Sequence, residues 1–102
     1  MISESLAITI SQEASVALLR IARNYQSQGL LHQALTPYLK IVAYYPDSEA
    51  APAAVEGVVA IAKAFEERQQ LYIATGVYDR LEEAARFQRW DGHALTEDGD
   101  II

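Results

Sequence analysis

The sequence predicts an all-α protein, and two observations carry this prediction. The first is an internal repeat: Ile21, Ala22, Tyr25, Ala34, Tyr38 and Ile41 recur forty residues later as Ile61, Ala62, Phe65, Ala74, Tyr78 and Leu81. The second is that apolar residues in each copy follow the three- and four-residue spacing of one helix face. Repetition with this periodicity predicts two copies of a helical pair.

The first predicted helix covers residues 11–28. One of its faces is apolar and consists of Ala14, Ala17, Leu18, Ile21, Ala22 and Tyr25. Thr9 and Gln12 have the spacing of a capping box at its start, and Gly29 is placed to end it. Residues 1–8 remain open to two interpretations, a short helix or a strand, because their apolar residues fit both spacings.

The second predicted helix covers residues 31–45, with a buried stripe of Ala34, Leu35, Tyr38, Ile41, Val42 and Tyr45. Pro37 lies near its start, where few amide groups have helical partners and a proline costs less. Pro46 ends the helix, and Asp47 and Ser48 supply turn or N-cap chemistry.

The helices of the second copy are predicted at residues 49–68 and 70–88. Pro52 falls in the first turn of the earlier helix, where proline is tolerated. Each helix has one interior glycine, Gly57 and Gly76, which weakens it by up to about 1 kcal/mol relative to alanine. Gly57 either permits close packing or is simply tolerated. The apolar faces are Val55, Val58, Val59, Ile61, Ala62 and Phe65, then Ala74, Val77, Tyr78, Leu81 and Ala85.

Composition limits the domain count and the possible partners. The 102 residues predict one domain, residues 1–90, followed by a flexible acidic tail, residues 91–102. The net charge is −6, and Lys and Arg form no cluster, so we expect no nucleic acid and no anionic membrane as partner. There is no cysteine and no apolar run of about 18 residues, and the N-terminus is a poor secretory signal. These features predict a cytoplasmic protein.

The first copy, residues 15–48, closely resembles a tetratricopeptide repeat. The residues that match the family pattern in order and spacing are Leu18, Ile21, Ala22, Tyr25, Gly29, Ala34, Tyr38 and Pro46. The second copy, residues 55–88, departs from the pattern because Gln69 replaces the turn glycine and Arg86 replaces the closing proline. The spacing of forty also exceeds the family's repeat of about thirty-four residues. The resemblance implies two antiparallel helix pairs in a right-handed stack.

The resemblance also implies a concave surface that binds a peptide or helix of another protein. Its lining would be Val16, Leu19, Arg20, Arg23 and Ser27 from the first copy, with Glu56, Val59, Ala60, Lys63 and Glu67 from the second. Arg20, Arg23 and Lys63 would form a basic spot for a carboxylate or an acidic helix. The alternative is that these three are solvated surface charges.

Aromatic residues outside the repeat core are further candidates for an interface. Tyr44, Tyr72 and Trp90 have no core position in the repeat, and exposed aromatics are typical anchors of protein interfaces. The alternative is that they pack against helix ends. Arrays of this kind usually need about three repeats, so the two copies here predict a homodimer or larger assembly.

The sequence contains no pattern for catalysis or metal binding. No nucleophile and base set or glycine-rich phosphate loop can be assembled, so we expect neither enzyme activity nor a cofactor. His32 and His93 have no second His or Cys at ligand spacing, so no metal site is expected. The leading hypothesis is a non-catalytic adaptor or assembly scaffold. The alternatives are a small acidic chaperone of the secretion type and a structural oligomer or module of a larger chain.

Overall fold

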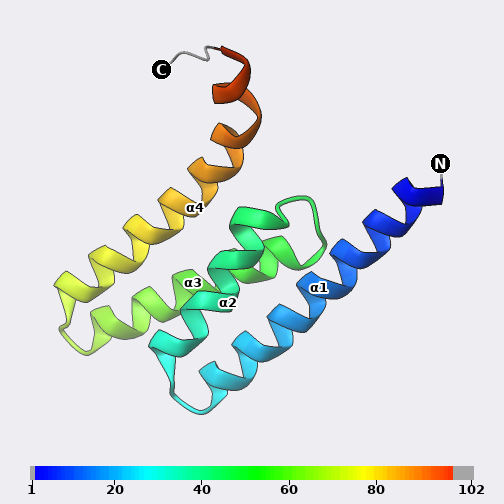
Figure 1. Ribbon diagram of the computed structural model, residues 1–102. Helices are drawn as coiled ribbons and strands as arrows, with labels where there is room; N and C mark the ends of the chain where they lie inside the picture. Colours follow the sequence, from blue (N-terminus) through cyan, green and yellow to red (C-terminus); the bar gives the residue numbers. More distant parts are fainter. Residues whose placement is uncertain (1, 98–102) are drawn as a thin grey trace.

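The chain folds into four α-helices in the computed structural model shown in Figure 1. The structure describes the backbone of residues 2–97 and the side chains of residues 10–87. The helices are α1 (Ile2–Ser27), α2 (Leu31–Tyr44), α3 (Ala50–Glu67) and α4 (Leu71–Glu97). α1 packs on α2, α3 packs on α4, and α2 also contacts α3 and α4. α1 and α4 therefore lie at opposite edges with α2 and α3 between them, which confirms the predicted all-α fold of adjacent pairs.

The first helix begins earlier than the sequence predicted. α1 starts at Ile2, so the predicted start near Ser11 is wrong, and the capping box of Thr9 and Gln12 lies inside a helix. The physical reason is that neither glycine nor proline occurs before Gly29, so nothing in this stretch ends a helix. Of the two interpretations of residues 1–8, the helix is correct from Ile2 onward.

The last helix also extends beyond the prediction. α4 continues to Glu97, so residues 91–97 of the predicted tail are helical. Gly92 costs a helix only about 1 kcal/mol relative to alanine, which is too little to end it by itself. The predicted tail residues 98–102 lie outside the described residues.

The turns within the two helix pairs have the same geometry, forty residues apart. The Gly29 amide donates to the Gln26 carbonyl and the Leu30 amide to the Tyr25 carbonyl, at 2.9 and 3.0 Å. The Gln69 amide donates to the Glu66 carbonyl and the Gln70 amide to the Phe65 carbonyl, both at 2.9 Å. This pair of bonds is a Schellman motif, whose turn residue is left-handed. The φ angles are 80° at Gly29 and 66° at Gln69, so Gln69 adopts a conformation that favours glycine.

The connection between the two helix pairs is short and consists of residues 45–49. α2 ends at Tyr44 and α3 begins at Ala50, within one residue of the predicted bounds. In between, the Ser48 amide and hydroxyl both donate to the Tyr45 carbonyl, at 3.1 and 2.8 Å. Ser48 therefore forms the turn, and it does not cap α3, whose N-cap residue is Glu49.

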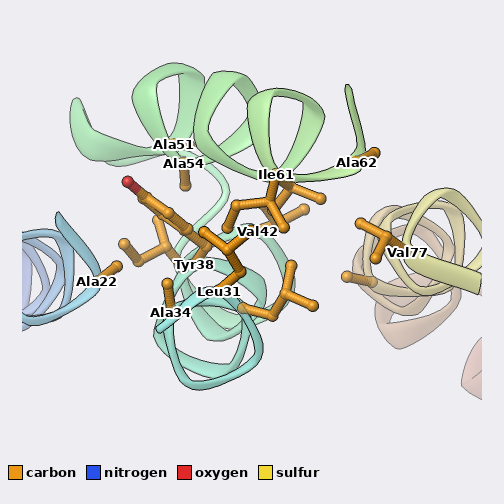
Figure 2. Close-up of a cluster of buried hydrophobic side chains, with 14 of the residues drawn as sticks. Ala22, Leu31, Ala34, Tyr38, Val42, Ala51, Ala54, Ile61, Ala62 and Val77 are labelled. Atoms are coloured by element: carbon orange, nitrogen blue, oxygen red, sulfur yellow. The ribbon is translucent and has the colours of Figure 1, made fainter. Parts of the chain in front are cut away.

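The core lies where α2 meets the other three helices, as Figure 2 shows. Small side chains allow these helices to approach closely: Ala22 of α1, Ala34 of α2 and Ala54 of α3 are each fully buried. Tyr38 fills the space between α1 and α3, and it is only 2% exposed. The other large residues of the core are Leu35, Ile41, Val58, Ile61 and Phe65, and Ala74 and Val77 of α4 belong to the same cluster.

The two interior glycines have different roles. Gly57 lies flush against the Tyr38 ring, and a Cβ added at Gly57 would overlap three ring carbons. A Cβ added at Gly76 would meet nothing within 4 Å. Gly57 is therefore required for close packing, while Gly76 is tolerated.

Candidate interaction surfaces

The predicted concave surface is exposed along α1. Val16, Arg20, Arg23 and Ser27 are exposed, and Leu19 is half-buried. Because these residues follow one side of a regular helix, they form a continuous strip. The Ser27 hydroxyl donates to the Asn24 carbonyl at 2.9 Å, so this side chain is turned back onto its own helix.

Arg23 is not a free surface cation. Burial raises the pKa of the Tyr38 phenol, and the charge of the nearby Arg23 guanidinium and its hydrogen bonding partly oppose this shift. The same hydroxyl donates to the Gln26 side-chain oxygen at 2.5 Å. Arg23 therefore belongs to a small polar cluster that covers the end of a core tyrosine.

The second copy repeats this cluster with a change of charge. Burial raises the pKa of Tyr78, and the charge and hydrogen bonding of the Glu66 carboxylate raise it further. Glu66 stands forty residues after Gln26, as Tyr78 stands after Tyr38. Lys63, the counterpart of Arg23, is exposed, and Val59 is half-buried. The acidic Glu66 lies on the same helix as Lys63, so this part of the predicted surface is mixed in charge.

A hollow of about 400 Å³ lies on α1, beside part of the predicted surface. Among the described residues its lining is Gln12, Glu13, Val16 and Arg20. Glu13 was not predicted to lie here, and its carboxylate shares the hollow with Arg20. The predicted basic spot is therefore acidic and basic in equal measure at this end.

A second hollow lies between α2 and α4 and draws on both repeats. This groove, which we call the α2–α4 groove, has a volume of about 410 Å³. Its lining is Thr36, Leu39, Lys40, Ala43 and Tyr44 from α2, with Arg80, Glu83, Ala84 and Phe87 from α4. Leu39 and Ala43 are half-buried and Ala84 is buried, so they form an apolar floor. The groove has a floor that can take an aliphatic side chain and a rim that can take a charge.

The rim of the α2–α4 groove carries more positive than negative charge. Lys40 and Arg80 are exposed and occupy the same position in the two copies, forty residues apart. Glu83 is the single acidic residue of the lining. In the described part of the chain, the ion pair found is Arg86 with Glu82 at 3.5 Å, and it leaves the two rim cations available.

The predicted interface aromatics have different surroundings. Tyr44 is 60% exposed and packs edge-on against Phe87, with ring centroids 5.4 Å apart. Tyr72 is 92% exposed at the start of α4. The Trp90 side chain lies outside the described residues. Of the residues that line the α2–α4 groove, only Tyr44 was among the interface residues predicted from the sequence, so Lys40, Arg80 and Phe87 were not predicted.

His32 has a packing role in the structure. Its ring lies 5.2 Å from the Phe65 ring, and the Arg68 guanidinium lies 5.9 Å from the same ring. Within the described residues, no three His, Cys, Asp or Glu side chains come together in a way that could hold a metal ion. His32 and Arg68 instead cover one end of the core.

The outer flank of α1 carries exposed aliphatic side chains. Ile21 is 46% exposed, whereas Ile61, its counterpart on α3, is 0% exposed. The difference arises because α2 covers the flank of α3, while in the described structure no helix covers the corresponding flank of α1. Ile10, on the same helix, is 57% exposed.

Comparison with family models, with curated proteins and with solved structures finds no match for this chain. None of the described helices is long and apolar enough to cross a membrane. The candidate surfaces are therefore interpreted from their own geometry and chemistry.

Proposed function

We propose that the chain is a non-catalytic protein-interaction module of the tetratricopeptide type, a small adaptor or assembly scaffold that binds a peptide or helix of a partner protein. The observation that carries this proposal is the α2–α4 groove, with its apolar floor, its exposed aromatic pair and its two cations at equivalent positions. Pockets that combine these elements are typical of protein-recognition sites.

The repeat geometry supports the assignment to this type of module. The two turns share one hydrogen-bond pattern. In each copy the tyrosine of the second helix lies beside an equivalent residue of the first helix, Tyr38 beside Gln26 and Tyr78 beside Glu66. A chain that repeats a helix pair in this way gains surface for binding along its length.

The chemistry of the groove defines the partner. The floor of Leu39, Ala43 and Ala84 suits a leucine-sized side chain, and the paired rings of Tyr44 and Phe87 add apolar surface to the lining. Lys40 and Arg80 suit carboxylates, since charge-assisted hydrogen bonds are stronger than neutral ones. We infer a partner segment with aliphatic residues on one side and Asp or Glu beside them.

The test uses a synthetic helical peptide with a stripe of leucines flanked by glutamates. Fluorescence anisotropy of the labelled peptide should show saturable binding to the wild-type protein, and NMR should show shift changes at Ala43 and Ala84. The charge-reversing variant K40E/R80E should bind at least tenfold more weakly. A peptide with lysines in place of the glutamates should not bind.

The matched control is the variant R20E/R23E/K63E, which reverses the basic spot predicted on α1 and α3. It should bind the peptide with unchanged affinity. If this variant loses binding and K40E/R80E keeps it, the partner site lies on the α1 and α3 face and the groove assignment is wrong. If the glutamate peptide does not bind at all, the proposed function itself is contradicted. Circular dichroism of each variant verifies that the fold is retained.

A chaperone function is the second candidate, favoured by the exposed apolar side chains Ile10, Ile21 and Tyr72. A chaperone that shields apolar stretches should suppress the aggregation of a denatured reporter protein, measured by light scattering. An adaptor should leave that aggregation unchanged. The two functions are therefore separated by one measurement.

Self-association completes the proposal. Two helix pairs leave the outer flank of α1 uncovered, and arrays of this kind usually require further coverage of such a flank for stability. We propose that the chain acts as a dimer. Sedimentation of the wild-type protein at micromolar concentration should show a dimer, and a monomer would contradict this part.

A further inference from the structure

The outer flank of α1 has a self-complementary pattern. Ile10, Ala14, Ala17 and Ile21 follow each other at spacings of four, three and four residues, which places them on one stripe. We call this stripe the outer seam. Its two ends are exposed isoleucines, and its two central alanines are half-buried. A stripe with small residues in the middle and large residues at both ends fits an antiparallel copy of itself.

The outer face of α4, at the opposite edge of the molecule, is polar at two of the positions that α2 uses to cover α3. α2 covers α3 with residues that include Leu35 and Val42, which are 1% and 5% exposed. Their counterparts on α4 are Thr75 and Glu82, both exposed, although Leu71 remains apolar there. A polar outer face is typical of the terminal repeat of a stack. Stacking of one copy's α4 on the next copy's α1 is therefore disfavoured.

We propose that two copies of this chain associate through their outer seams, with the two α1 helices antiparallel about a twofold axis. This inference rests on the self-association proposed above and specifies its surface. In this register Ile10 packs against Ile21 of the second copy, and Ala14 lies opposite Ala17 of the second copy. The interface is isologous, so it closes as a dimer and does not extend into a filament.

The charges beside the outer seam support this register. Glu13 and Arg20 are seven residues apart, so they lie on the same side of the seam, and both line the hollow on α1. Both side chains are exposed, and no ion pair involving them is found in the described part of the structure. When two α1 helices pack antiparallel, the residues along one side of the outer seam face the residues along the equivalent side of the second copy's outer seam. Glu13 of each copy therefore comes close to Arg20 of the other, and the twofold axis makes two such pairs.

Sedimentation equilibrium tests the interface. The wild-type chain should have twice its 11.3 kDa mass, and I10E/I21E should be a monomer. The matched control Y72E alters a side chain that is 92% exposed on α4, and it should remain a dimer. A wild-type dimer that persists in I10E/I21E would overturn the outer seam while leaving self-association intact. A dissociated Y72E would place the interface at the α4 edge.

Charge exchange tests the register. E13R alone and R20E alone should each weaken dimerisation, because like charges then meet across the seam. The double variant E13R/R20E should restore the wild-type dissociation constant. Failure of restoration, with both single variants impaired, would overturn the proposed antiparallel register.

Cysteine crosslinking gives an independent measure, because the natural chain has no cysteine. An equimolar mixture of A14C and A17C should form mixed disulfides faster than either variant forms its own. Faster crosslinking of A14C with itself would indicate parallel helices and overturn the proposal. The monomeric I10E/I21E should still bind the glutamate peptide, so loss of the dimer and loss of peptide binding are distinguishable.

Discussion

The Tyr38 ring lies directly against the backbone of Gly57, and this contact joins α2 of the first repeat to α3 of the second. The ring is 2% exposed and its hydroxyl is held by Gln26 of α1, so it has little freedom to move. The contact therefore links three helices through one side chain.

Gly57→Ala should destabilise the protein by about 1–3 kcal/mol, the usual cost of overpacking a tight core. Gly76→Ala is the matched control, and it should stabilise the protein by up to about 1 kcal/mol because alanine is the better helix former. Urea unfolding measures both changes. In combination with Tyr38→Ala the added cost of Gly57→Ala should disappear. Equal effects of the two alanines would contradict the close contact.

Gln69→Gly should stabilise the protein by about 1 kcal/mol, because Gln69 has a φ of 66° and a left-handed residue with a Cβ is strained. Gly29→Ala at the equivalent turn should have the opposite effect of similar size. Thermal unfolding followed by circular dichroism measures both. The control Gln70→Gly, at a position with negative φ, should not stabilise. Destabilisation by Gln69→Gly would show that the turn does not carry this strain.

Stability should fall as the pH rises above about 10, because burial raises the pKa of Tyr38 above its usual value of 10.0. A raised folded-state pKa means that the unfolded chain loses the proton first, so stability is fully present below the unfolded pKa and is lost as pH approaches the folded one. Urea unfolding at pH 8 and at pH 11 should show this loss. Tyr38→Phe should reduce it, and the exposed Tyr72→Phe serves as the control. A loss of the same size in Tyr38→Phe would exclude Tyr38 as its source.

Ile61→Ala should cost about 2–5 kcal/mol, because Ile61 is 0% exposed and its removal leaves a cavity. Ile21→Ala alters the same position of the first repeat, where the side chain is 46% exposed. Its cost should be smaller in dilute solution and should increase with protein concentration, since a dimer interface adds its stability by mass action. Unfolding at two protein concentrations measures the difference. If Ile21→Ala and Ile61→Ala lower the free energy of unfolding equally at both protein concentrations, the proposed difference between the two positions is contradicted.

Much of the fold could be predicted because the repeat places small and large residues at fixed helical positions. The burial of Ala22, Ala34 and Tyr38 follows from that spacing. The start of α1 could not be predicted from the capping signal at Thr9, because a local cap motif also occurs inside helices when no glycine or proline interrupts them. The two roles of Gly57 and Gly76 depend on a contact between different helices, and no local pattern contains that information.

The candidate surfaces were harder to predict than the core. Register identified Val16 and Arg20 as surface residues on one strip, and both are exposed. Register did not reveal that Arg23 lies beside the Tyr38 hydroxyl, nor that Phe87 would meet Tyr44. Both contacts depend on the distances between α2 and the helices beside it, and helical periodicity does not determine these distances.

The matched turns at Gly29 and Gln69 also bear on how the chain folds. Each joins two antiparallel helices that are neighbours in sequence, so most of the packing within a pair forms without closing a long loop. We therefore expect contacts within each hairpin to form first and the docking of α2 on α3 to follow. A chain with this order of events should fold within microseconds to milliseconds, the range of small helical proteins with local contacts. We expect the second hairpin to nucleate more slowly than the first, because Gln69 must adopt a left-handed conformation that is unfavourable for a residue with a Cβ.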